Sequence, residues 1–154
     1  MKVLIAAVGK PRNTALAAAI EEYERRASHY WPLEVHEVRE EPSKSLSADL
    51  VRDKEGVRLS DAVPSSAHLV ACDPGGASKT SEEFSAWLQG EREKGHDVAF
   101  VIGGAFGLSE AVRKRARTRL SLAPWTLPHE LARLVLAEQL YRAGSIVKRE
   151  PYHK

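Results

Sequence analysis

A glycine-rich stretch at residues 98–109 contains the residue types and spacing that most directly suggest chemistry. It starts with five consecutive apolar residues, Val98–Ile102, which are typical of a strand buried on both faces. The glycine pair Gly103 and Gly104 follows at once, and Ser109 then offers an N-cap for a helix. In α/β proteins, ligands bind outside the carboxyl ends of such strands. The stretch therefore predicts either a ligand-binding turn or a plain connection between strand and helix.

The common nucleotide-binding and nucleophile motifs are absent from the sequence. No G-x-G-x-x-G pattern follows the first predicted strand, and no G-x-x-x-x-G-K-[ST] pattern occurs anywhere. The single cysteine, Cys72, lies in an apolar run, which favours packing over nucleophilic chemistry. No group of cysteines and histidines has zinc-ligand spacing, so we expect no metal.

Length and composition predict a single domain, residues 1–154, of a soluble protein. Hydrophobic residues make up 43% of the chain and charged residues 29%, which is ordinary for a globular domain. The apolar runs are too short for a signal-peptide core or a membrane span, and we expect a cytoplasmic protein. A formal net charge of +2 does not by itself indicate a nucleic-acid partner.

Strand and helix patterns alternate along the chain, which predicts an α/β fold with a mostly parallel sheet and helices on both faces. The predicted strands are Lys2–Val8, Leu33–Val38, His68–Cys72, Val98–Ile102 and Leu120–Leu122. The predicted helices lie at about 14–28, 45–61, 80–95, from 109 onward, and 128–147.

Two local predictions rest on residue type and spacing. The run Asp73-Pro74-Gly75-Gly76 has the composition of a turn. The helix at about 45–61 is expected to place its apolar residues roughly on one side, with Gly56 weakening its interior. Those apolar residues are Leu46, Leu50, Val57 and Leu59.

The last predicted helix is apolar on more than one side. One stripe comprises Ala132, Leu136, Leu140, Ala143 and Val147, and the opposite side carries Leu131, Leu134, Val135, Tyr141 and Ile146. A helix with two apolar sides packs on two sides. The alternatives are a helix wedged deep in its own domain and a helix that contacts another subunit. In so short a chain we favour the second, a two-fold homodimer.

A wider pattern adds to the glycine turn. After Val101-Ile102-Gly103-Gly104 and Gly107-Leu108-Ser109 come Thr126-Leu127-Pro128-His129, the run Leu136–Ala143 and the ending Pro151-Tyr152-His153-Lys154. In order and spacing these motifs resemble the RlmH family of SPOUT methyltransferases, which methylate N3 of a pseudouridine in 23S rRNA. The resemblance covers essentially the whole chain. It implies a C-terminal trefoil knot, against the rule that chains are unknotted.

The resemblance also implies that S-adenosylmethionine (SAM) is the methyl donor, bent within the knot and held mostly by backbone groups. Carried onto this sequence, its contacts fall on Cys72, Gly103, Leu122, Ala123, Pro124, Trp125, Thr126 and Leu127. Position 72 is often leucine in the family, so the smaller thiol predicts looser packing. Because the sulfonium already makes the methyl group electrophilic, no metal is required.

The target nitrogen of such an enzyme is protonated at neutral pH, so a group must remove its proton or stabilise the resulting charge. The resemblance points to His129, Arg142, Tyr152 and His153 as catalytic candidates. We expect His153 or His129 to assist proton removal. Arg142 would stabilise charge on a uracil oxygen or hold phosphate, and Tyr152 would orient the base. The structural alternatives are a helix cap at His129, an ion pair of Arg142 with Glu138 and a disordered tail.

Basic residues supply the predicted RNA contacts. A dense cluster comprises Arg113, Lys114, Arg115, Arg117 and Arg119, and the tail adds Lys148, Arg149 and Lys154. Such runs are usually solvated helix faces, but each neutralised phosphate adds salt-dependent affinity. In a dimer, the tail of one subunit could complete the pocket of the other. The family substrate is the assembled ribosome.

Two other functions are compatible with the sequence. One is a non-catalytic ribosome-binding factor that kept the fold, and the other is a SPOUT enzyme that methylates a different rRNA position. The glycine turn and the Tyr152-His153 tail argue against the first.

Overall fold

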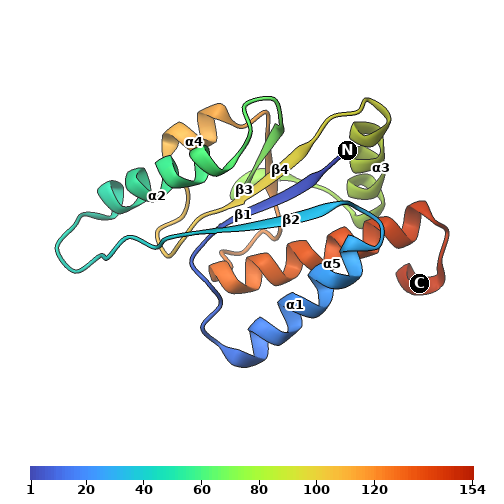
Figure 1. Ribbon diagram of the computed structural model, residues 1–154, viewed down its shortest axis with the longest axis horizontal. Helices are drawn as coiled ribbons and strands as arrows, with labels where there is room; N and C mark the ends of the chain where they lie inside the picture. Colours follow the sequence, from blue (N-terminus) through green and yellow to red (C-terminus); the bar gives the residue numbers. More distant parts are fainter.

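The computed structural model describes residues 1–154 as one five-stranded parallel sheet flanked by helices (Figure 1). The strands are β1 (Val3–Val8), β2 (Leu33–Val38), β3 (His68–Ser78), β4 (Val98–Ile102) and β5 (Thr118–Ser121). The helices are α1 (Thr14–Ser28), α2 (Ala48–Ala62), α3 (Ser81–Glu93), α4 (Glu110–Arg115) and α5 (His129–Val147), and a short 3-10 helix spans Pro151–His153. The strand order is β2-β1-β4-β3-β5, and every pairing between neighbouring strands is parallel.

The core lies on both faces of the sheet. Every residue of β1 and β4 is buried, as their continuous apolar runs predict for the central strands of a parallel sheet. One face packs against α1, α3 and α5 in a cluster that includes Trp31, Phe100 and Leu140. The other face packs against α2 and α4 through Leu59 and Val112. No helix combines the length and the apolar character that a membrane crossing requires.

Four helices start at side-chain caps that the sequence contains. Asn13, Ser47 and Ser109 each accept a hydrogen bond from a backbone N–H of the first turn of α1, α2 and α4. Thr80 and Glu83 form a complete capping box at the start of α3. These caps explain why the predicted helix starts agree with the structure within a few residues.

The predicted turn at Asp73–Gly76 is wrong, because these residues continue strand β3 as an irregular segment paired with β5. The register shifts between Cys72 and Ala77, and the intervening residues bulge. A Cβ at Gly76 would lie 2.5 Å from the carbonyl carbon of Arg119, so glycine permits the close approach of the two strands. The composition of this run suggested a turn, but Gly76 lies in a strand and allows the backbone of β5 to pack closely against it.

The predicted inward face of α2 is also wrong at two positions. Val57 is 62% exposed and Leu50 is 42% exposed, whereas Glu55 and Gly56 face the interior. A Cβ at Gly56 would lie 2.3 Å from Oγ of Ser109, the N-cap of α4. The helix therefore turns its glycine toward α4, because only glycine allows this contact between α2 and the start of α4.

Helix α5 packs against α1 on one side and α3 on the other. Its Gly144 faces the ring of Tyr30, and a Cβ there would lie 2.2 Å from that ring. The guanidinium of Arg133, almost fully buried, pairs with Glu24 at 2.7 Å and Glu37 at 2.8 Å. Contacts within the chain therefore account for much of the two-sided character of this helix.

Candidate functional site

A cavity of about 730 Å³ opens at the carboxyl ends of β3, β4 and β5. Its volume lies within the range of small-molecule sites, and about half of its lining residues are hydrophobic. Three segments form its walls: Cys72–Pro74 in β3, Ile102–Leu108 after β4, and most of the residues from 122 to 129 before and at the start of α5. The glycine turn predicted to bind a ligand is thus one wall of this cavity.

The glycine turn is held in a closed form by its own backbone. The N–H of Gly107 donates to the carbonyl of Gly104 at 3.0 Å, and Gly107 has a φ of +82°, a conformation that favours glycine. A Cβ at Gly103 would lie 2.5 Å from the carbonyl carbon of Gly107 and 2.6 Å from its oxygen. The turn therefore requires glycine at position 103, where no side chain covers the backbone that lines the cavity.

The segment between β5 and α5 supplies most of the opposite wall. Leu122, Ala123, Trp125, Thr126 and Leu127 all line the cavity, together with Cys72 and Gly103. Of the predicted SAM contacts, only Pro124 is not among the lining residues. The structure thus brings together seven of the eight residues, from three separate parts of the chain.

Aromatic side chains lie at the cavity with much of their surface in solvent. The side chain of Trp125 is 78% exposed and that of Phe106 is 42% exposed. Both rings line the cavity, so either one is available to contact a bound ligand. Phe106 was not singled out from the sequence, although it lies inside the glycine turn.

The thiol of Cys72 faces the cavity but has little solvent around it. Burial raises the pKa of this thiol to about 12. The group is therefore protonated at neutral pH, which agrees with the prediction that Cys72 packs and does not act as a nucleophile.

His129, the first residue of α5, lines the cavity, as a catalytic or ligand-binding role requires.

Glu55, which was not singled out from the sequence, lies behind the glycine turn: a Cβ at Gly104 would be 2.9 Å from its Oε1. That oxygen has no hydrogen-bond partner, and Oε2 accepts only the N–H of Glu41 at 3.2 Å. Burial raises the pKa of Glu55, and the charge of Glu40 adds to this. Its spacing of four from the buried residues Val51 and Leu59 was the available signal.

The basic cluster predicted to bind RNA is divided by the fold. Asp73, at the cavity edge, accepts two hydrogen bonds from Arg119, the shorter at 2.6 Å, and pairs with Arg113 at 3.3 Å. Burial alone would raise the pKa of Asp73, but these arginines and the N–H of Gly75 together lower it. Arg115 donates to backbone carbonyls at the end of α2.

Lys114, Arg115 and Arg117 are all exposed and form no ion pair, but backbone carbonyls hold the guanidinium of Arg115. Lys114 and Arg117 are therefore the members whose side chains make neither an ion pair nor a hydrogen bond. The cluster is therefore not one solvated face. Part of it positions the cavity wall, and a smaller part is free to contact phosphate.

Arg142, Tyr152 and His153 do not lie at the cavity of their own chain. Arg142 is thirteen residues beyond His129 on α5, which places it about 20 Å further along the helix. Figure 1 shows the same separation, with the C-terminus at the far end of α5 from its first turn.

Arg142 and Tyr152 instead form a cluster around Glu138. Its Oε1 accepts from Arg142 at 2.7 Å and from the hydroxyl of Tyr152 at 3.0 Å. The guanidinium of Arg142 also lies 4.9 Å from the centre of the Tyr152 ring. Burial, followed by hydrogen bonds with Tyr23 and Glu138, raises the pKa of Tyr152. The alternative pairing of Arg142 with Glu138 is therefore confirmed, and the tail is ordered.

Comparison with known proteins gives a consistent result. A family model described as "Predicted SPOUT methyltransferase" matches residues 1–153. The ribosomal RNA large subunit methyltransferase H of Gemmatimonas aurantiaca is 60% identical over 154 residues, covering all of both chains. The protein of that name from Listeria monocytogenes serotype 4b is 45% identical over 159 residues, again covering all of both chains.

Among solved structures, TrmJ from Z. mobilis ZM4 has a similar fold. The match covers 93% of this chain and 70% of that one, with a TM-score of 0.52 and 16% sequence identity. The parallel α/β architecture and the family match together confirm the predicted SPOUT knot fold.

Proposed function

The chain belongs to the SPOUT methyltransferase family, and from this premise we propose that its cavity binds SAM and that it methylates N3 of a pseudouridine in 23S rRNA of the assembled ribosome. The observation that carries the proposal is the glycine turn at the cavity, where even a Cβ at Gly103 would collide with backbone. The whole chain, residues 1–154, acts as the catalytic domain in the cytoplasm, where its ribosomal substrate is found.

The size and the lining of the cavity support SAM as its ligand. Members of this class use SAM as methyl donor, and when bound it supplies an electrophilic methyl group without any metal. The turn at Gly103 and the segment from Leu122 to Leu127 offer backbone N–H and C=O groups beside apolar side chains. Such a surface suits an adenine ring and its polar edge.

The proton on N3 must leave as the new bond to carbon forms, so a base is needed at the cavity mouth. His129 is the nearest imidazole, since it lines the cavity. Its ring nitrogen would accept the N3 proton, while the N3 lone pair forms the bond to the methyl carbon and the carbon–sulfur bond breaks. Glu55, behind the turn, is near enough for its charge to interact with that of an imidazolium formed at His129.

A second subunit completes the site in this proposal. Arg142 lies about 20 Å along α5 from His129, and neither Tyr152 nor His153 lines the cavity of its own chain. In this proposal the three residues act in trans, at the cavity of a two-fold partner. The half-exposed apolar residues Leu131, Leu134 and Val135 on α5 support an interface there. In trans, Arg142 would stabilise charge on a uracil oxygen and Tyr152 would orient the base.

Methyl transfer to ribosomes that lack the modification tests the proposal, with nucleoside mass spectrometry of the product. We expect N3-methylpseudouridine in 23S rRNA. Methylation of another nucleoside would assign the chain to a different SPOUT reaction. Binding to ribosomes without SAM binding would support the non-catalytic factor instead.

Mixed dimers test the composite site. A dimer of one Gly103→Ala subunit and one Arg142→Ala subunit has one cavity and one tail intact. If the tail acts in trans, this dimer recovers one working site at limiting SAM, where each variant homodimer is impaired. If Arg142 serves its own cavity, no site recovers. Arg25→Ala, an exposed change on α1 outside the cavity and the tail, is the matched control and keeps full activity.

A further inference from the structure

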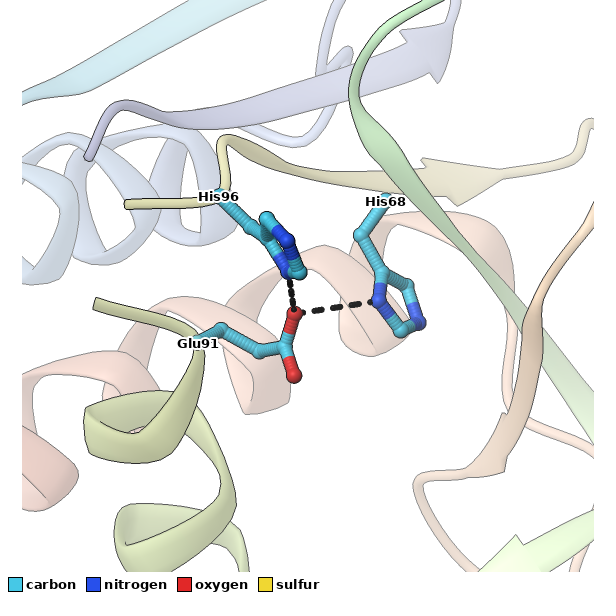
Figure 2. A group of neighbouring side chains, drawn as sticks. All are labelled: His68, Glu91 and His96. Atoms are coloured by element: carbon cyan, nitrogen blue, oxygen red, sulfur yellow. Dashed lines mark hydrogen bonds and ion pairs between the residues drawn. The ribbon is translucent and has the colours of Figure 1, made fainter. Parts of the chain in front are cut away.

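Two histidines and a glutamate converge at the opposite edge of the sheet from the cavity. His68 is the first residue of β3, His96 lies two residues before β4, and Glu91 belongs to the last turn of α3. Their ligand atoms all lie within 4.8 Å of one another. Figure 2 shows both imidazole rings directed at the same carboxylate. We propose that His68, Glu91 and His96 bind a divalent transition-metal ion, with Zn²⁺ as the preferred ion.

The distances suit a tetrahedral ion. Oε2 of Glu91 lies 3.2 Å from Nδ1 of His68 and 2.8 Å from Nδ1 of His96. With metal–ligand bonds of about 2.0–2.1 Å, two ligand atoms of a tetrahedral site are separated by about 3.3 Å. Small side-chain rotations therefore convert the hydrogen-bonded cluster into a three-ligand site. As each Nδ1 binds the metal, the single proton of the neutral imidazole would move to Nε2, so neither histidine loses a net proton.

The groups behind the ligands match those of known metal sites. Nε2 of His68 lies 2.8 Å from Oγ1 of Thr118, so it can donate its N–H there while Nδ1 binds the metal. Oε1 of Glu91 is held by Lys94 at 3.0 Å, which leaves Oε2 free for the ion. The two buried ligands are thus oriented by neighbours that stay in place when the metal binds.

Burial of the ligands is graded from the interior to the surface. The side chains of His68 and Glu91 are only 13% and 5% exposed, whereas that of His96 is 45% exposed. His96 therefore gives the ion a path to the site, and a water molecule can take the fourth position. Two imidazoles and one carboxylate favour Zn²⁺ over Mg²⁺ and Ca²⁺, which prefer sites made of oxygen atoms alone.

The site has a structural role and is separate from methyl transfer. Its ligands join β3, α3 and the start of β4 at the amino ends of the strands, whereas the cavity lies at their carboxyl ends. An ion that binds the folded chain and not the unfolded chain raises stability with its concentration. We therefore expect Zn²⁺ to raise the melting temperature and to leave SAM affinity unchanged.

Titration calorimetry of the full chain, stripped with a chelator, tests the site with Zn²⁺ and Mg²⁺, and Co²⁺ absorption reports the geometry. We expect one Zn²⁺ per chain, no heat from Mg²⁺ and the intense visible bands of tetrahedral Co²⁺. His96→Gln should abolish the Co²⁺ bands. Thr118→Val, which keeps all three ligands, should weaken Zn²⁺ binding by roughly 10–100-fold.

His36→Gln is the matched control, because His36 is a half-exposed histidine near a single glutamate, Glu34. Its Zn²⁺ affinity should equal that of the wild type. Equal Zn²⁺ affinity in the wild type and in folded His96→Gln would overturn the proposal. So would weak, octahedral Co²⁺ spectra, since the three residues would then be only a hydrogen-bonded cluster that ties β3 to α3.

Discussion

Replacement of Gly103 by alanine adds one methyl group to the wall of the cavity. The added Cβ would lie 2.5 Å from the carbonyl carbon of Gly107, 2.6 Å from its oxygen and 2.9 Å from the nitrogen of Leu108. All three atoms belong to the backbone, so no side-chain rotation can relieve the contact. Since carbon atoms pack at about 3.5–4.0 Å, the turn must open by roughly 1 Å.

The cost of this opening falls on SAM binding. Overpacking of a rigid site costs about 1–3 kcal/mol. If the turn must close again to bind SAM, the same energy weakens the complex, by roughly 5- to 150-fold in Kd. Titration calorimetry with SAM measures Kd directly, and circular dichroism verifies that the variant is folded.

Gly90→Ala is the matched control. A Cβ at Gly90 meets no atom within 4 Å, and the residue lies within α3. This variant should gain about 0.5–1 kcal/mol of stability, because alanine loses less entropy in a helix. Its SAM affinity should be unchanged. A folded Gly103→Ala protein that binds SAM as tightly as the wild type would refute our account of the turn.

Three further predictions concern buried polar groups. Because burial raises the pKa of Cys72 to about 12, its thiol should carry about 1,000-fold less thiolate at pH 8 than a free cysteine. Alkylation of Cys72 should therefore be slow, and bound SAM should slow it further. Labelling at the rate of a free thiol would contradict this. Arg133→Met should lower the free energy of unfolding, measured in urea, by about 3–5 kcal/mol, because it leaves Glu24 and Glu37 without their partner. Arg25→Met, at an exposed ion pair, should lower it by under about 1 kcal/mol. Burial raises the pKa of Glu55 in the folded chain, so the unfolded chain releases this proton first. Wild-type stability should then fall relative to Glu55→Gln as pH rises above about 4.5 and level off past the folded pKa, and parallel pH profiles of the two proteins would refute it.

The sequence predicted elements well wherever one local signal decides the conformation. The apolar run Val98–Ile102 identified the buried central strand, and side-chain caps such as Ser47 and Thr80 marked where helices begin. The prediction failed where contact with a residue distant in the sequence decides the conformation. Gly76 resembles a turn residue, but it lies in a strand because the backbone of Arg119 packs against it.

The site shows the same division. Local motifs and the family resemblance were enough to predict that Gly103 and the segment before α5 share one binding site, and both line the same cavity. Tertiary structure alone decided that Glu55 lies behind the turn and that Arg142 lies far from the cavity. It alone also brought His68 and His96, twenty-eight positions apart, onto one carboxylate. Spacing along the chain records contacts within a helix or strand, whereas packing between elements depends on the whole sheet.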